Sequence, residues 1–118
     1  MLSQAENERL TLTGPGTSMG QVFRSYWQPV LLSRELVAEG PQLRVKILGE
    51  DFIAFRDGAG NVGVVSPRCP HRGADLYLGR NEACGLRCGY HGWQFDVQGQ
   101  CVDVPTAEAA VADKIKSN

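Results

Sequence analysis

The residues of this chain with the clearest capacity for chemistry are two cysteines and two histidines in two short motifs. One residue separates Cys69 from His71, and two residues separate Cys88 from His91. The motifs contain both histidines of the chain and two of its four cysteines. Because thiolates suit iron–sulfur clusters and zinc, and imidazoles suit iron or zinc, the two motifs predict a metal centre.

The spacing of these four residues favours two metal ions over one. Structural zinc sites take paired cysteines from one short motif, so that both sulfurs bind the same ion. Here each motif supplies one cysteine and one histidine, which suits a Rieske [2Fe–2S] centre with two cysteines on one iron and two histidines on the other. We expect Cys69 and Cys88 on the inner iron, and His71 and His91 on the outer iron. A zinc-binding structural module and a set of unrelated core residues are the alternatives.

Three glycines, Gly73, Gly89 and Gly92, flank the expected ligands. A residue without a side chain allows positive φ in a tight loop and lets backbone N–H groups approach the bridging sulfides. Such N–H···S bonds, together with burial, tune the reduction potential. For any one of the three, an ordinary turn glycine is an equally good interpretation.

Length and composition predict at most one globular domain. A formal charge of −1 without a lysine or arginine run argues against nucleic-acid and anionic-membrane partners. No apolar run approaches the length of a membrane span, and residues 1–9 do not have the pattern of a signal peptide. Cysteines without a secretory signal are typical of a reducing compartment, so we expect a cytoplasmic protein and metal ligation in preference to disulfides.

The N-terminal part predicts a loosely held arm over residues 1–17 and then a helix from Met19 to about Tyr26, capped by Ser18 and ended by Pro29. The rest of the chain predicts an antiparallel arrangement of short strands. The expected strands are residues 30–32, 43–48, 52–56, 62–65, 85–87, 93–97 and 101–105, with a short turn or helix at 75–78.

In this arrangement the two ligand motifs are the tips of neighbouring hairpins, which brings all four ligands to one end of a small β-structure. Trp93 follows the second motif and either shields the cluster from water or fills the core. Residues 58–63 match the dinucleotide pattern Gly-x-Gly-x-x-Gly, but a strand and then Pro67 follow. Because that motif needs a helix N-terminus for the pyrophosphate, we expect no nucleotide site.

The Cys-Pro-His-Arg-Gly-Ala sequence of residues 69–74 and the Cys-Gly-Tyr-His-Gly-Trp sequence of residues 88–93 resemble the cluster loops of Rieske non-haem iron oxygenases. Residues 14–20 and 23–30 are similar to the phthalate-dioxygenase-type oxygenase components of that family. The resemblance implies a mainly β fold, a Rieske-type antiparallel β-sandwich with two cluster-binding hairpin loops and a short N-terminal helix.

The resemblance also divides the chain into an N-terminal arm and short helix, residues 1–27, and a Rieske [2Fe–2S] domain, residues 28–118. This domain is expected to lack the last hairpin, so that one sheet edge is left unpaired. The family places no ligand at Cys84 or Cys101, which are therefore expected to be small hydrophobic fillers.

Respiratory Rieske proteins carry a disulfide between their loops and a serine after His-Gly, and the matching positions here are Ala74, Tyr90 and Trp93. With fewer hydrogen bonds to the sulfurs, the expected potential lies at the low end of the Rieske range of roughly −150 to +300 mV.

Oxygen activation in the family requires a mononuclear Fe(II) held by two histidines and a carboxylate. Since the cluster uses both His71 and His91, no residue of this chain is expected to be catalytic. The resemblance implies an electron-transfer domain of an aromatic-ring oxygenase. It would take electrons from a reductase or ferredoxin and pass them to a catalytic domain of its own or a neighbouring subunit, commonly in a homotrimer. A free-standing Rieske ferredoxin is the alternative, which the helix around Phe23 disfavours.

Overall fold

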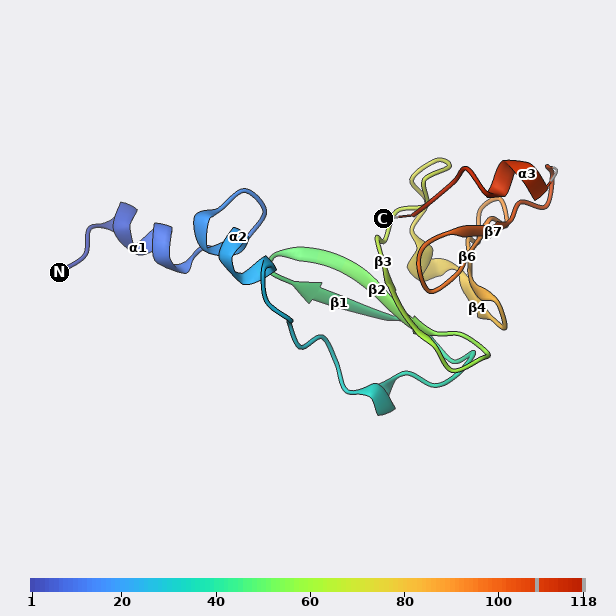
Figure 1. Cartoon of the computed structure of the whole chain (residues 1–118), viewed down its shortest axis with the longest axis horizontal. Helices are drawn as coiled ribbons and strands as arrows, with labels where there is room; N and C mark the ends of the chain where they lie inside the picture. The colour runs from blue at the N-terminus through green and yellow to red at the C-terminus, as the bar shows by residue number, and fades with distance from the viewer. Residues whose placement is uncertain (108, 118) are drawn as a thin grey trace.

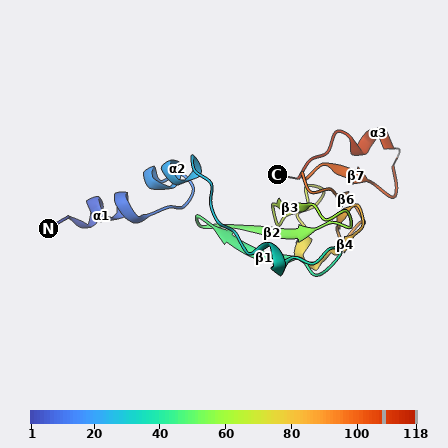
Figure 2. The same cartoon turned by 60° about the horizontal axis from the view of Figure 1, so that its bottom comes forward.

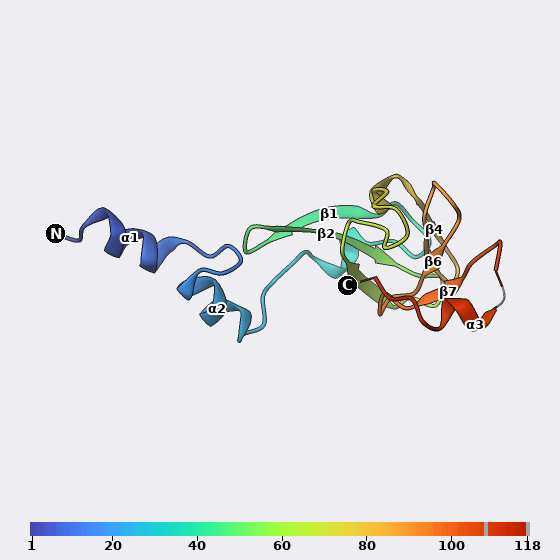
Figure 3. The ribbon, with the colours of Figure 1, turned by 90° about the horizontal axis from the view of Figure 1, so that it is seen from above.

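The computed structural model describes residues 1–107 and 109–117, which form two antiparallel sheets and short helices. The molecule is elongated, with extents of 60 × 30 × 22 Å. The N-terminal helices lie at one end, the first sheet in the middle and the second sheet at the other end (Figures 1 and 3). The predicted mainly antiparallel β fold is confirmed. Within the described ranges, no helix has the length and apolar character needed to cross a membrane.

The expected loose arm contains a helix, α1 (Gln4–Thr11), so that part of the prediction is wrong. Its first turn is closed by a capping box, in which the Glu6 N–H donates to the Ser3 hydroxyl and the Ser3 N–H donates to the Glu6 carboxylate. This reciprocal pair satisfies two backbone donors that the start of a helix leaves open. Helix α1 stands clear of both sheets (Figure 2), whereas Gly14 and Pro15, which follow it, lie near Gly49 in the turn between β1 and β2.

The second helix, α2 (Ser18–Arg24), was predicted, but both of its ends differ from the prediction. Thr17 rather than Ser18 is the N-cap, since its side chain accepts a hydrogen bond from the Gly20 N–H. The helix ends at Arg24, whose guanidinium contacts the Glu50 carboxylate at 2.6 Å. Because Glu50 begins the second strand of the first sheet, this ion pair attaches α2 to that sheet.

The first sheet is a three-stranded antiparallel meander of β1 (Leu43–Ile47), β2 (Glu50–Arg56) and β3 (Val62–Val65), in that order. All three strands and their connectivity were predicted. The glycine-rich segment 58–63 leads into β3 and not into a helix.

The apolar residues 30–32 form no strand, which corrects the prediction. They lead directly into a 3-10 turn, η1 (Ser33–Glu35). Side-chain hydrogen bonds hold this segment in place of a strand ladder. Arg56 Nε donates to the Leu36 carbonyl at 2.8 Å, and Arg56 Nη2 donates to the Ser33 carbonyl at 2.9 Å. The chain reaches β2 only further along, where Ala38 forms a single parallel bridge with Arg56.

The second sheet consists of β4 (Arg80–Glu82), β5 (Gly85–Arg87), β6 (Gln94–Phe95) and β7 (Cys101–Asp103). Neighbours in this order pair antiparallel. The last two strands are shorter than predicted, because the register shifts within β6 and the turn that follows begins at Asp96.

The two sheets and the loops between them share one buried core. Residues of both sheets and of the short helix η2 (Leu76–Leu78), which was expected at 75–78, fill its centre. These core residues are Ile53, Phe55, Val65, Leu76, Leu86 and Phe95. Cys69 and Cys88 belong to the same cluster of buried residues. The core therefore carries the two thiols of the predicted metal centre.

The sheet edge at β7, which was expected to be unpaired, is covered by the segment that follows α3 (Ala109–Ala112). The Cys101 N–H donates to the Ile115 carbonyl at 2.9 Å, and the Ser117 N–H donates to the Gly99 carbonyl at 2.6 Å. Main-chain groups of residues 115–117 thus satisfy this edge. The prediction of an open edge is wrong at this place.

Candidate metal centre

The first ligand motif lies in a closed loop between β3 and η2. The Cys69 N–H donates to the Ala74 carbonyl at 2.9 Å, and the Gly73 N–H donates to the Cys69 carbonyl at 2.8 Å. Gly73 has a φ of 71°, a conformation that glycine adopts without steric cost. A single antiparallel bridge between Arg68 and Asp75 closes the loop, in place of the paired strands that were predicted.

The second ligand motif repeats the backbone pattern of the first. The Cys88 N–H donates to the Trp93 carbonyl at 2.8 Å, and the Gly92 N–H donates to the Cys88 carbonyl at 3.1 Å. Gly92 has a φ of 77°. This loop is the tip of the β5–β6 hairpin, in agreement with the prediction. The two loops differ in the number of residues between cysteine and histidine, but the backbone hydrogen bonds around the two cysteines are the same.

Both cysteine side chains of the motifs face the interior, with Cys69 at 2 % and Cys88 at 3 % relative exposure. Burial raises the pKa of the Cys69 thiol to about 11, and the neighbouring Cys88 thiol adds to this rise. The N–H groups of His71 and Arg72 act on the Cys69 sulfur in the opposite direction. Since thiolate is the form that binds metal, loading this pair releases its protons.

The two histidine rings lie side by side, with their centroids 4.5 Å apart. His71 is half-buried and His91 is exposed. The Nδ1 atom of His71 is buried and has no hydrogen-bond partner among the described residues. Burial lowers the pKa of His71, and the nearby His91 and Arg72 lower it further. A neutral imidazole with an unpartnered buried nitrogen is suited to accept a metal ion there.

An aromatic side chain packs against each histidine. Trp93 stacks on His71 with the ring centroids 4.4 Å apart and the planes 7° from parallel. The ring centroids of Tyr90 and His91 lie 3.8 Å apart, with 39° between the ring planes. Trp93 therefore covers one face of the His71 ring and also packs against the buried core. The contact of Tyr90 with His91 was not foreseen, because a tyrosine inside a loop gives no indication of its orientation.

The four predicted ligands come together as two pairs, one of thiols and one of imidazoles. Across residues 1–107 and 109–117, no three histidine, cysteine, aspartate or glutamate side chains are arranged around a common point for one metal ion. The remaining cysteines lie outside these pairs. Cys101 is buried in the core as predicted, whereas Cys84 is exposed in the turn between β4 and β5, so the prediction of a core filler is wrong for it.

The first loop is supported by Arg44 of strand β1 and by Gln42, which directly precedes that strand. Arg44 of β1 forms an ion pair of 2.7 Å with Asp75 and lies over the Tyr77 ring at 4.3 Å. Asp75 in turn accepts from the Tyr77 N–H and so caps η2. Gln42 donates to the Gly79 carbonyl at 2.9 Å. These contacts lie largely at the surface.

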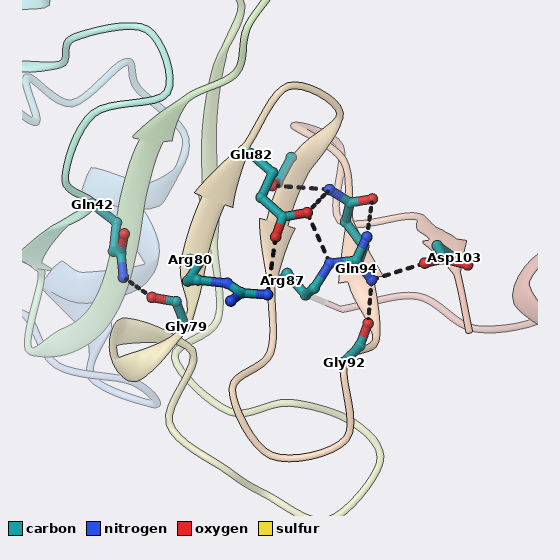
Figure 4. Close-up of polar contacts among 9 residues, drawn as sticks. Gln42, Gly79, Arg80, Glu82, Arg87, Gly92, Gln94 and Asp103 are labelled. Carbon is teal, nitrogen blue, oxygen red and sulfur yellow. Dashed lines mark hydrogen bonds and ion pairs between the residues drawn. The ribbon is translucent and has the colours of Figure 1, made fainter. Parts of the chain in front are cut away.

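The second loop is supported by Arg87 of β5, whose guanidinium makes hydrogen bonds in several directions (Figure 4). Its Nη1 donates to the Gly92 carbonyl at 2.6 Å and to Asp103 at 2.8 Å. Its Nε donates to Glu82 at 2.8 Å, and its Nη2 donates to Gln94 at 3.1 Å. Hydrogen bonds to Glu82 and Asp103 raise the pKa of Arg87. The sequence reasoning missed this group, although an arginine directly before each ligand cysteine is visible in the chain.

Two buried thiols, two adjacent imidazole rings and an unpartnered buried nitrogen on one of these rings are a set of donors that fits a two-iron iron–sulfur cluster. A family model described as "Rieske [2Fe-2S] domain" matches residues 26–116. The chain therefore belongs to the Rieske domain family, whose cofactor is a [2Fe–2S] cluster.

Several relatives are oxygenase subunits. The chain is 52% identical, over 86% of its length, to the 3-chlorobenzoate-3,4-dioxygenase oxygenase subunit of Comamonas testosteroni, of which it covers 23%. It is 43% identical, over 98% of its length, to the phthalate 4,5-dioxygenase oxygenase subunit of Pseudomonas putida, of which it covers 27%. The chain spans about a quarter of the length of these relatives.

The chain also resembles solved structures of oxygenases. A crystal structure of dicamba monooxygenase with non-heme iron and dicamba matches with a TM-score of 0.68 and 33% identity, over 79% of this chain and 28% of that one. The chain is thus a Rieske domain that matches part of aromatic-ring-hydroxylating oxygenase subunits of the phthalate dioxygenase type, as the two motifs predicted.

Proposed function

We propose that Cys69 and Cys88 ligate the inner iron of the [2Fe–2S] cluster and that His71 and His91 ligate the outer iron. The observation that carries this proposal is the arrangement of two buried thiols and two adjacent rings, one with an unpartnered buried Nδ1. When bound, the cluster supplies a one-electron carrier. The chain's own residues exclude water from the thiolates, fix the two rings and leave His91 exposed to an electron-transfer partner.

The iron and acid-labile sulfide content of the purified chain tests this ligand set. The wild-type chain should hold the two irons and two sulfides of one cluster and be red-brown, with a rhombic EPR signal when reduced. Cys69→Ser and His91→Ala should lose most of the cluster, whereas Cys84→Ser, which changes an exposed cysteine outside the pairs, should keep it. A colourless protein with one zinc would contradict the proposal.

In the whole protein, we propose that this domain relays electrons within an aromatic-ring oxygenase, so that the chain is part of an enzyme that acts with O₂. Its partners would be a reductase or ferredoxin donor and a catalytic domain with a mononuclear Fe(II), in its own or a neighbouring subunit of a homotrimer. The oxygenase-subunit relatives and the exposed His91 support this role. The charge balance of the chain argues against nucleic-acid and anionic-membrane partners, and we propose a cytoplasmic location for the protein.

We also propose the division into an arm and short helix, residues 1–27, and a Rieske-type β-sandwich, residues 28–118, that lacks the last hairpin. Trp27 is fully exposed at the junction, and α2 contacts the first sheet through the Arg24 ion pair. An exposed tryptophan beside a separate pair of helices suits an arm that contacts the body of the oxygenase.

A free-standing Rieske ferredoxin is the second candidate. The observation in its favour is that residues 115–117 cover the edge of β7, so the second sheet needs no further strand there. The coding sequence beyond residue 118 distinguishes the two candidates. A downstream domain with a two-histidine, one-carboxylate iron motif supports the oxygenase, and a stop codon supports the ferredoxin.

A further inference from the structure

Each ligand cysteine is preceded by an arginine that reaches forward to the same place in its loop. Arg68 Nη1 contacts the carbonyl of Gly73 at 3.3 Å, and Arg87 Nη1 contacts the carbonyl of Gly92 at 2.6 Å. In both loops the acceptor lies five residues after the arginine and belongs to the glycine with positive φ. The arginine thus adds a side-chain contact across the loop to the main-chain bonds of the ligand cysteine.

The two arginines differ in how they are held. The Arg68 contact lies at the surface. The Arg87 side chain is 20% exposed and is fixed from behind by Glu82 and Asp103, which come from the neighbouring strand β4 and from β7. A guanidinium with its donors in a rigid planar fork can satisfy several acceptors at once, so these partners fix its direction toward Gly92. Figure 4 shows the side chain between the carboxylates and that carbonyl.

Gly92 occupies a sensitive position in the second loop. It lies between His91, a proposed ligand, and Trp93, whose ring stacks on His71. A shift of the Gly92 peptide therefore turns His91 and moves the ring that covers His71. A Cβ added at Gly92 would come 3.0 Å from Pro105 Cγ, so there is little free space beside the Gly92 Cα.

We infer that Arg87 is a positioning residue for the cluster, which holds the second ligand loop closed by donating from its guanidinium to the Gly92 carbonyl. The inference rests on the proposed ligand set. Arg68 makes the corresponding contact in the first loop, but its exposure to water makes that contact weak. Retention of the cluster depends on the loop that Arg87 holds more than on the loop that Arg68 holds.

The test compares Arg87→Gln with Arg68→Gln, a matched pair that removes one guanidinium from each loop and leaves every ligand in place. In the metal-free full chain, amide hydrogen exchange at Cys88 and Gly92 should be about tenfold faster in Arg87→Gln, the effect of losing the one hydrogen bond that Arg87 makes to a carbonyl of the loop. In Arg68→Gln, exchange at the corresponding amides of the first loop should rise by less than about threefold.

In the cluster-loaded chain, Arg87→Gln should release iron and sulfide to excess chelator about tenfold faster than wild type and should change the EPR g-values of the reduced cluster. Arg68→Gln should leave both nearly unchanged. Equal effects of the two substitutions, or unchanged exchange at Cys88 and Gly92 in Arg87→Gln, would overturn the inference.

A role confined to sheet stability is tested by Glu82→Gln, which weakens the contacts behind Arg87 while leaving its bond to Gly92 possible. A loop-holding role predicts a smaller rise in exchange at Gly92 than in Arg87→Gln, and equal rises would overturn it. If Arg87→Gln does not fold, Arg87→Lys is measured in its place. Lysine keeps the charge without the fork, so exchange and cluster release should still exceed wild type, and wild-type values would overturn the inference.

The exchange measurement also separates this inference from the proposed ligand set. A wild-type chain that loads no cluster contradicts the ligand set, whereas the exchange rates of the metal-free variants still decide the role of Arg87. Unchanged exchange in a variant that loads a normal cluster contradicts the role of Arg87 alone.

Discussion

The two ligand loops have the same internal hydrogen bonds but different surroundings. In each loop the cysteine N–H bonds to a carbonyl five residues ahead and a left-handed glycine donates back to the cysteine. The first loop is closed by one bridge and supported by surface contacts from Arg44. The second is the tip of a hairpin and is supported by Arg87, which is largely buried.

This difference shows that local sequence sets the shape of a ligand loop, whereas its rigidity depends on the elements around it. Contacts of exposed side chains are weakened by water and salt, and buried charged groups with several partners are not. The second loop should therefore be the more rigid of the two, and the first loop the one that opens more readily.

The largest expected difference between the loops concerns their left-handed glycines. Gly73→Ala should cost about 1–2 kcal/mol from the strained backbone alone, because no atom lies within 4 Å of the added Cβ. Gly92→Ala should cost about 1–3 kcal/mol more, because its Cβ meets Pro105 Cγ at 3.0 Å. Urea unfolding of the metal-free chain measures both. Equal costs would mean that Pro105 moves aside and that the second loop is not the more confined one.

A smaller difference is expected from the two aromatic side chains. Trp93→Leu should lower the free energy of unfolding by about 1–2 kcal/mol, since the half-buried ring loses its stack on His71. Tyr90→Leu should change it by less than about 0.5 kcal/mol, because Tyr90 is exposed. Trp27→Leu, at a fully exposed tryptophan, is the control and should have no effect. A larger loss for Tyr90 than for Trp93 would contradict the expectation that Trp93 makes the more stabilising of the two aromatic contacts.

The smallest effect is expected at the surface support of the first loop. Asp75→Asn should cost about 0.5–1 kcal/mol at neutral pH, because it removes the ion pair with Arg44. Burial alone would raise the pKa of Asp75, but hydrogen bonds from Arg44 and from the Tyr77 N–H outweigh it and hold the pKa below its ordinary value.

The sign of the pH dependence follows from that shift. The contribution of Asp75 is fully present above its unfolded pKa of about 3.9 and is lost as the pH falls through the lower folded pKa. Acid unfolding curves of the wild type and Asp75→Asn should therefore approach each other below about pH 3.9. A gap that stays constant into acid would show that the ion pair is not what stabilises the first loop.

Much of the fold was readable from local sequence. The meander of β1, β2 and β3 followed from alternating apolar residues and glycine turns, and the β5–β6 hairpin followed from strands on both sides of a glycine-containing loop. The four expected ligands were predicted from their residue types and their spacing in the sequence. The capping box of α1 was also readable from Ser3 and Glu6, but it was not recognised.

The missed features depend on contacts between distant segments. Residues 30–32 are as apolar as a strand, yet Arg56 of β2 bonds to the Ser33 and Leu36 carbonyls, and the chain bridges to β2 only at Ala38. Residues 115–117 bond to the edge of β7, and no local sequence pattern predicts this contact. The convergence of Glu82, Gln94 and Asp103 on Arg87 depends on the register of the whole second sheet, which residue types alone do not specify.

The positions of the two tryptophans give the molecule a built-in optical reporter. Trp93 lies against His71, where an iron–sulfur chromophore would absorb its emission, while Trp27 stands in water far along the chain. Loading of the cluster should quench the fluorescence of Trp93 and leave that of Trp27 unchanged. The remaining fluorescence, from Trp27, would then report on binding of the N-terminal segment to another protein surface.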